Sequence, residues 1–442
     1  MRVDSPPRPD SPPRPDPAPI ADAPTADTPL PDAVPRLGVD VDLTYPVTHT
    51  ERDLDGMWRA LRHHEPVAWH PYDGTPPGFW VVSSHRAATE VYRDNERFTS
   101  VHGNVLATLL NGGDSAGGKM LAVSDGERHK AVRRKLLRSF TQASLAGTTA
   151  RVTEVVRRLV REAAERGTGD FASDVAARIP LLAICDLLEV PEQDRDQLYK
   201  HASNSLATDS PEILDEDSRL SRNEILLYFA QLLRSRGDLP GEGILSRMSE
   251  LMKDDVRLRL DELLFNCYSL LIGGDETTRL SMIGAVEAFA AMPGEWDRLR
   301  RGEVPVASAV EEILRWTTPA MHSGRTATQD TVLEGCAIAA GDTVTIWNNA
   351  ANFDPAQFPD PDRFDLGRKP NRHLSFAYGP HFCLGAALAR IELTALLEAL
   401  VEYVDEMTVT GTPQRIYSNF ARGFHSLPVR LVPRRDTVKG NP

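Results

Sequence analysis

One stretch of the sequence limits the fold more than any other, the proline-free helical segment from about Arg257 to Met292. Pro293-Gly294 follows it directly, a pair that is typical of a helix end. At 1.5 Å per residue this segment would form a helix about 50 Å long, enough to cross a whole domain. Its middle carries Gly273-Gly274, and each glycine inside a helix costs about 1 kcal/mol relative to alanine. We therefore expect the backbone to approach another group closely there.

The remaining pattern predicts a mainly helical domain with small β-sheets over residues 37–434. Helical periodicity covers residues 51–64, 85–94, 127–140, 143–166, 172–188 and 217–235. Strand-like segments occupy residues 66–71, 79–83, 343–347 and 427–432.

Both ends of the chain differ from this domain. Residues 1–36 hold 12 of the 33 prolines and contain the six-residue repeat DSPPRP at 4–9 and 10–15. Such a composition buries too little apolar surface to offset its ordering entropy, so it predicts a disordered or polyproline-like tail. Residues 435–442 are expected to form a short C-terminal tail.

Charge and cysteine usage exclude several classes of protein. The net charge is −13, from 63 acidic and 50 basic residues, which disfavours a nucleic-acid partner. The four cysteines form no CxxC pair, so a disulfide framework or a zinc ribbon is not expected and a reducing compartment fits. The sequence has neither a run of 18 apolar residues nor a signal-peptide pattern at its start. We therefore expect a cytoplasmic protein that does not enter a membrane.

The strongest chemical signal is the ten-residue segment FAYGPHFCLG, Phe376 to Gly385, which runs into an amphipathic helix starting near Cys383. Backbone N–H groups at a helix N-terminus lower the pKa of a thiol and stabilise its charge. Gly379 would permit a tight turn, and Gly385 a close backbone approach. A single buried cysteine before a helix is usually inert packing, so the interpretation depends on its neighbours.

Those neighbours resemble the haem-binding loop of the cytochrome P-450 family, Phe-Gly-x-Gly-x-His-x-Cys-x-Gly. Every defined position matches except Ala377, which stands where glycine is usual. The resemblance implies a triangular-prism fold that binds haem b (iron protoporphyrin IX) between the long helix and the helix after the loop. Cys383 would be the axial ligand of the iron, with Phe376, Gly379 and Gly385 shaping the loop around it.

Glu312 and Arg315 form a second match, the ExxR pair. Residues three apart share a helix face, and alone such a pair is usually a solvated salt bridge. In the family an arginine of a later Pro-x-Arg-Phe segment completes it, here Arg363. The resemblance implies a structural ion network that supports the haem loop.

A third match lies in the long helix, Gly273-Gly274-Asp275-Glu276-Thr277-Thr278. By correspondence, Gly273 and Gly274 would lie against haem, Thr277 would hydrogen-bond the iron-bound oxygen species, and Glu276 would supply it with protons. The alternative is a threonine that bonds back to its own helix.

The resemblance also implies a set of cofactor and substrate contacts. The anionic haem propionates would be bound by His129, Arg133, Arg325 and His381, and the role of His373 stays open. The substrate pocket would be lined by residues 97–112 and by Leu270, Gly273, Ala320, Met321 and Phe424. These residues are mostly small or apolar, which favours a small hydrophobic substrate, and we expect a natural product.

The implied reaction is reductive activation of O2 by a haem-thiolate monooxygenase. The sequence has no GxGxxG fingerprint, so a ferredoxin and a ferredoxin reductase are the expected electron donors. The basic segment 128–138 would meet the acidic ferredoxin, although a solvated helix face remains the alternative. Two other functions stay open, an H2O2-dependent peroxygenase and a non-catalytic haem-binding sensor or recognition module. One deviation, Phe353 where the family commonly has arginine, has no assigned consequence.

Overall fold

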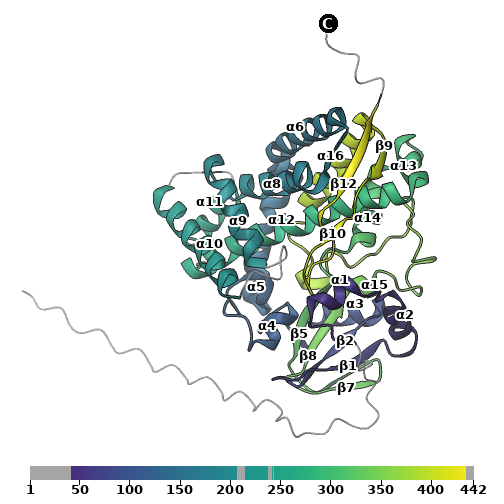
Figure 1. Cartoon of the computed structure of the whole chain (residues 1–442). Helices are drawn as coiled ribbons and strands as arrows, with labels where there is room; N and C mark the ends of the chain where they lie inside the picture. The colour runs from purple at the N-terminus through teal and green to yellow at the C-terminus, as the bar shows by residue number, and fades with distance from the viewer. Residues whose placement is uncertain (1–40, 207–214, 237–240, 242, 435–442) are drawn as a thin grey trace, which may run out of the picture.

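The computed structural model of the chain describes residues 41–206, 215–236, 241 and 243–434, and in these ranges it is mainly helical with small sheets, as predicted. Helices fill the upper and left parts of the molecule, and the largest sheet lies at the lower right (Figure 1). Both predicted tails, 1–36 and 435–442, lie outside the described residues.

The predicted long helix is confirmed as α12, Leu260–Ala291, which has 32 residues and crosses the centre of the molecule (Figure 1). It begins three residues later than predicted because Arg257 has a φ of 49°, which no right-handed helix accommodates. Glu262 in its first turn accepts a hydrogen bond from the Arg259 N–H at 2.7 Å. Pro293 begins the next helix, α13 (Pro293–Arg300).

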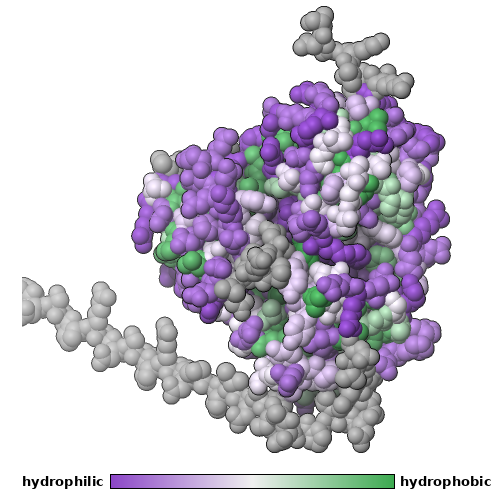
Figure 2. Space-filling view, viewed as in Figure 1, coloured by the Kyte–Doolittle hydropathy of each residue, from purple (hydrophilic) through white to green (hydrophobic). Residues whose placement is uncertain are grey.

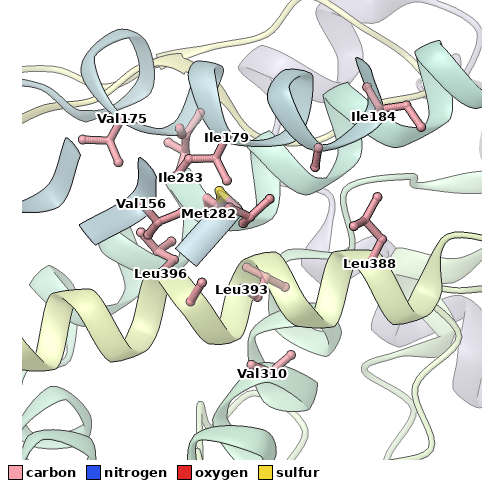
Figure 3. Packing of buried hydrophobic residues seen from close by; sticks show 14 of the residues in the cluster. Val156, Val175, Ile179, Ile184, Met282, Ile283, Val310, Leu388, Leu393 and Leu396 are labelled. Atoms are coloured by element: carbon pink, nitrogen blue, oxygen red, sulfur yellow. The ribbon is translucent and has the colours of Figure 1, made fainter. Parts of the chain in front are cut away.

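The main core forms where α12 meets α6 (Gln142–Arg166), α8 (Ile179–Leu187) and α16 (Ala386–Tyr403). Figure 3 shows Leu388 and Leu393 of α16 below Ile184 of α8, with Met282 of α12 beside them. Gly274 lies where α12 passes close to α8, because a Cβ placed on it would come 2.8 Å from Cγ1 of Ile184. Close packing against α8 therefore explains why a glycine occupies this helical position despite its low helix propensity.

One predicted helix, 172–188, is wrong as a single element. It is divided into α7 (Phe171–Asp174), the 3-10 turn η3 (Ala176–Arg178) and α8. Val175 departs from helical geometry with φ −125° and ψ −63°, and Pro180 offers no N–H to a preceding turn. The chain therefore turns here and starts a new helix.

The other predicted helices are present with shifted ends. The segment 51–64 becomes two helices, and 127–140 becomes an α-helix that tightens into a 3-10 turn. The remaining helices are α1 (Pro46–Glu51), α2 (Asp55–His64), α3 (His85–Arg93), α4 (Leu106–Leu110), α5 (Gly126–Leu136) with η2 (Leu137–Phe140), α9 (Arg195–Leu206), α10 (Asp215–Arg236), α11 (Ile244–Leu251), α14 (Val306–Thr317) and α15 (Asn348–Ala351).

The four predicted strands are confirmed as β1, β2, β8 and β12. A five-stranded sheet has the order β1-β2-β8-β5-β3, and β4-β12-β9 form a three-stranded sheet. The hairpins β6-β7 and β10-β11 complete the set. The bounds are β1 (Val67–Pro71), β2 (Gly78–Val82), β3 (Phe98–Thr99), β4 (Thr168–Asp170), β5 (His322–Ala327), β6 (Thr331–Leu333), β7 (Cys336–Ile338), β8 (Thr343–Trp347), β9 (Val404–Val409), β10 (Gln414–Arg415), β11 (Phe424–Ser426) and β12 (Pro428–Pro433).

The visible face is predominantly hydrophilic, with apolar residues scattered in small patches (Figure 2). None of the helices in the described ranges combines the length and the apolar character needed to span a bilayer.

The close contact at Gly274 gives a testable prediction. Gly274→Ala should lower the free energy of unfolding by about 1–3 kcal/mol, because the added methyl group overlaps Ile184. The matched control is Gly147→Ala on the exposed face of α6, where a Cβ meets nothing closer than 3.6 Å and better helix propensity should add up to about 1 kcal/mol. Urea unfolding followed by circular dichroism measures both, and equal effects would contradict the packing role of Gly274.

Candidate active site

A cavity lies between α12, α16 and the loop before α16, and it gathers most of the residues predicted to form the site. Its wall also includes parts of α5, α8 and β5. The predicted residues that line it are His129, Arg133, Leu270, Gly273, Gly274, Thr277, Ala320, Phe376, His381, Cys383 and Gly385. Of the predicted loop 97–112, Asn104 reaches the cavity.

Cys383 is one of the residues that line this cavity. The loop turns back on itself, so that the Cys383 N–H donates to the Phe376 carbonyl at 2.8 Å. Burial raises the pKa of the Cys383 thiol, while the N–H groups of Gly385 and Ala386 and the charge of Arg133 lower it. The first amides of α16 therefore act as predicted, although the helix begins at Ala386 and burial outweighs them. A cation bound to the sulfur is what would hold it as a thiolate.

Ala377, where the family usually has glycine, adopts a left-handed backbone conformation. Ala377 has a φ of 55° and Gly379 a φ of 69°, so both lie in the left-handed region. Alanine pays about 1–2 kcal/mol there because its Cβ crowds the following carbonyl. A Cβ on Gly379 would in addition come 2.6 Å from the Tyr92 carbonyl oxygen, so glycine is needed at that second position for space as well.

This difference yields a matched pair of variants. Ala377→Gly should stabilise the protein by up to about 1 kcal/mol, because it removes left-handed strain but adds chain entropy to the unfolded state. Gly379→Ala should destabilise it by more than that gain. Thermal unfolding of the haem-loaded protein measures both effects, and a destabilised Ala377→Gly would contradict the strain.

A network of hydrogen bonds on the carboxylate of Glu312 supports the cysteine loop. Glu312 and Arg315 are fully buried and form a bidentate pair with distances of 2.8 and 2.9 Å. Glu312 also accepts from the Asp365 N–H and from the side-chain amide of Asn371, each at 2.9 Å. The predicted ExxR pair is thus a buried structural centre.

The third member of this network was predicted wrongly. Arg368, not Arg363, places its guanidinium on Glu312, with Nε 3.1 Å from Oε2. The Arg363 side chain is exposed, and its carbonyl oxygen accepts from Arg315 and Arg368 at 3.2 and 2.7 Å. The irregular segment that follows Pro361 turns the side chain of Arg363 outward and brings its backbone inward.

The position Phe353 also has a consequence. Its ring lies 5.0 Å from the guanidinium carbon of Arg315, and its centroid lies 5.6 Å from that of the Trp316 ring, with the two rings tilted at 49°. An aromatic face beside a buried guanidinium adds a favourable cation–π contact. The residue therefore covers the ion network from one side.

Variants of Arg368 and Arg363 test which arginine side chain belongs to the network. Arg368→Ala should cost about 3–5 kcal/mol of stability, because it leaves the Glu312 carboxylate with one fewer buried cation. Arg363→Ala should stay within about 0.5 kcal/mol, because only its backbone takes part. Haem retention and urea unfolding measure the two variants, and the reverse order would restore Arg363 as the third member.

A cluster of cationic and imidazole groups lies beside the cysteine loop. His129 stacks on His381 with ring centroids 4.5 Å apart, and His381 lies 2.8 Å from Asp125. Burial, together with His381 and Arg133, lowers the pKa of His129 to about 4. Neither ring nitrogen of His129 has a hydrogen-bond partner among the described residues. Buried Arg325 completes the cluster, acting by charge on both histidines.

This cluster fits the carboxylates of a bound cofactor. Two buried histidines and an arginine face one protein carboxylate, Asp125, and the orphaned nitrogens of His129 require a partner. Asp125 is a residue that the sequence did not indicate. Burial raises its pKa, but hydrogen bonds from His381, Thr99 and Ser100 outweigh this and hold the pKa well below the usual range.

Two further side chains brace the cysteine loop. Arg133 donates to the Phe382 carbonyl, in addition to lining the cavity. His373, whose role was open, lies 3.2 Å from Glu311, which also binds Arg390 at 2.6 Å. Arg390 in turn stands 4.7 Å over the ring of Phe376. His373 therefore belongs to an ion-pair chain below the loop.

The acid and the alcohol of α12 have different surroundings. Thr277 lines the cavity, and its hydroxyl donates to the Gly273 carbonyl at 3.2 Å. Glu276 is 3% exposed and does not line the cavity. It is bound instead by Arg279 at 2.6 Å, and this carboxylate raises the pKa of Arg279.

Two predicted pocket residues lie elsewhere. Met321 is buried in a separate cluster with Trp58, Phe79 and Trp347, and Phe424 lines another pocket with Glu287 and Arg415. Both positions followed from family correspondence alone, which does not fix the direction of a side chain. The sequence also gave no signal for Ile184, Ser323, Asn348 or Glu392, which line the cavity.

The basic segment predicted to meet a partner is α5 with η2. Half of its charge is engaged within the chain, since Arg128, Lys130 and Lys135 pair with Glu262, Glu127 and Asp254. Arg134 and Arg138 remain exposed. The nearby cysteine loop also exposes Tyr378 and Phe382, at 38% and 37%.

Known proteins are similar to this chain in both sequence and fold. Residues 301–428 match the family model described as Cytochrome P450. The chain is 45% identical over 392 residues to "Cytochrome P450 NovI" of Streptomyces niveus, covering 89% of this chain and 96% of that protein. It is 33% identical over 410 residues to "Steroid C26-monooxygenase" of Rhodococcus jostii, covering 90% and 86%. The solved structure of "P450 OxyD that is involved in the Biosynthesis of Vancomycin-type Antibiotics" superposes with a TM-score of 0.81 at 37% identity, covering 89% of this chain and all of that one.

The loop that carries Cys383 lies against one long helix with cationic groups beside it, and the family that the chain matches implies a haem cofactor. The chain belongs to the cytochrome P450 family and is a P450 monooxygenase.

Proposed function

We propose that this enzyme uses haem b to oxidise a small hydrophobic natural product with electrons from a ferredoxin and its reductase. The observation that carries the proposal is that Cys383 and Thr277 line the same cavity. When bound, haem with a thiolate ligand activates dioxygen and favours cleavage of its O–O bond.

The residues present fit this cofactor. Cys383 would hold the iron, and His129, Arg325 and His381 would bind the propionates, which supply the negative charge that their cluster lacks. Gly273 leaves its side of α12 open, since a Cβ there would meet nothing within 4 Å. Thr277 places a hydroxyl where it can hold a proton at the cavity wall.

The cavity lining supports a hydrophobic substrate. Apolar side chains from five elements form much of the wall, among them Leu121, Phe140, Ile184, Leu270 and Leu388. The involvement of OxyD in antibiotic biosynthesis supports a natural product as the substrate class.

The exposed surface of α5 and the cysteine loop supports docking of a ferredoxin. Arg134 and Arg138 offer positive charge, and Tyr378 and Phe382 offer aromatic contact area beside the loop that carries Cys383. Complementary charge of this kind speeds encounter with an acidic partner more than it strengthens binding.

Two other functions are less well supported. Peroxygenases of this fold typically carry Arg-Pro in place of the acid–alcohol pair, whereas this chain has Glu276-Thr277. A non-catalytic haem sensor or recognition module has no need of both that pair and Cys383.

The thiolate ligand is tested by spectroscopy. Reduced wild-type protein exposed to CO should show the Soret band at the position given by thiolate ligation, and Cys383→Ser should lose it. Cys336→Ser is the matched control, because this cysteine is partly exposed and its thiol donates a hydrogen bond to the Val67 carbonyl at 3.4 Å. A wild-type protein without the band would contradict the proposal.

Turnover separates the three functions. Product formation driven by NADH with added ferredoxin and reductase, under O2, supports the monooxygenase. Turnover with H2O2 alone would favour the peroxygenase, and binding of haem and CO without any turnover would favour the sensor.

A further inference from the structure

Glu392 is an acidic residue among buried apolar side chains of α16. It lies on α16, is 0% exposed and lines the cavity together with Leu388 and Leu393. Neither of its carboxyl oxygens has a hydrogen-bond partner among the described residues. An ionised carboxylate in such surroundings costs several kcal/mol, so the neutral acid is strongly favoured.

The charged group that acts on Glu392 is Asp275 of α12, which is itself 2% exposed. Burial raises the pKa of Glu392 well above its usual range, and the negative charge of Asp275 raises it further. The charge of Asp275 also raises the pKa of the Cys185 thiol on α8. The residue next to this cysteine, Asp186, is bound by Arg151 and Arg195.

The other helices packed against α16 add no opposing charge. The buried positions of α6 are Leu145, Thr148, Val152, Val156, Leu159, Val160, Ala163 and Ala164. On α14, Glu311 is bound by Arg390 and Glu312 by Arg315 and Arg368. Repulsion from Asp275 is therefore not compensated by a cation at Glu392.

Glu276 has the opposite environment. Arg279 binds it with three contacts between 2.6 and 3.2 Å, which favours the ionised carboxylate. A group that is already ionised has no proton to give until it takes one up. A neutral carboxyl at the cavity wall has one ready.

We propose that Glu392 and Asp275 hold one proton between them at neutral pH, and that Glu392 is a second proton donor to the cavity, separate from Glu276. In each transfer one proton leaves the Glu392 carboxyl for a hydroxyl or water in the cavity, no electron moves, and a proton from solvent restores the acid. This inference rests on the proposed function, because the delivered protons would serve oxygen activation.

Infrared spectroscopy of the haem-loaded, substrate-free enzyme tests the protonation directly. Wild-type protein at neutral pH should show the carbonyl stretch of a protonated buried carboxyl, with the expected shift in D2O. Glu392→Gln should lose this band. Asp275→Asn should still show the band, but as pH rises the band should disappear at a lower pH than in wild type, because the repelling charge is gone. Glu398→Gln, an exposed position on the same helix, is the control and should keep the wild-type band.

Unfolding measurements give a second readout that does not depend on activity. A folded-state pKa raised above its unfolded value of about 4.3 gives stability that is present below that pH and lost as pH rises. Glu392→Gln should therefore become progressively more stable than wild type as pH increases from about 4.3, whereas Glu398→Gln should follow wild type.

The coupling of NADH consumption to product formation tests whether Glu392 takes part in the reaction. Glu392→Gln should release several-fold more hydrogen peroxide per NADH consumed than wild type, with the thiolate CO band intact. If wild-type protein lacks the thiolate CO band, the proposed function itself is overturned. A normal CO band together with an infrared band that survives Glu392→Gln, or with unchanged peroxide release, would overturn only the role of Glu392.

Discussion

The site depends on the carboxylate of Glu312. It accepts hydrogen bonds from Arg315, Arg368, Asn371 and the backbone of Asp365, and so ties α14 to the irregular chain that leads to the cysteine loop. Ser375, at the start of that loop, donates to the Leu314 carbonyl of the same helix at 2.6 Å. Because these groups are buried, displacing one of them leaves others unsatisfied, and the position of Cys383 is fixed by a helix rather than by the loop itself.

Three carboxyl groups near the cavity differ in the hydrogen-bond and charge partners that surround them. Asp125 accepts hydrogen bonds from Thr99 and Ser100 and lies against His381, and Glu276 is bound by Arg279. Glu392 faces only the like charge of Asp275. Desolvation acts on all three, but only at Glu392 does nothing oppose it. Burial alone therefore does not set the protonation of an acid here; its partners do.

The sequence predicted the parts of the site that depend on local order. The long helix was predicted from its uninterrupted periodicity, whereas the loop around Cys383 and the pair Glu312–Arg315 were identified by their resemblance to short family motifs. Both kinds of signal are local in the sequence. The choice between Arg363 and Arg368 was not readable, since it depends on how an irregular segment folds back onto α14. Glu392 was missed for a different reason: within an apolar helical stretch, one acid gives no indication of whether it faces solvent, a cation or a cavity.

Charge counted along the sequence also overstated the basic surface. Arg128 and Lys135 of α5 lie close to acids from the chain around 254–262, so their charge ties α5 to the start of α12. What remains outward is a smaller patch, Arg134 and Arg138, next to two exposed aromatic rings of the cysteine loop. Exposed ion pairs contribute little to binding energy, whereas aromatic side chains at an interface bury large areas. Recognition at this surface would therefore combine weak steering by charge with contact through Tyr378 and Phe382, close to the segment that carries Cys383.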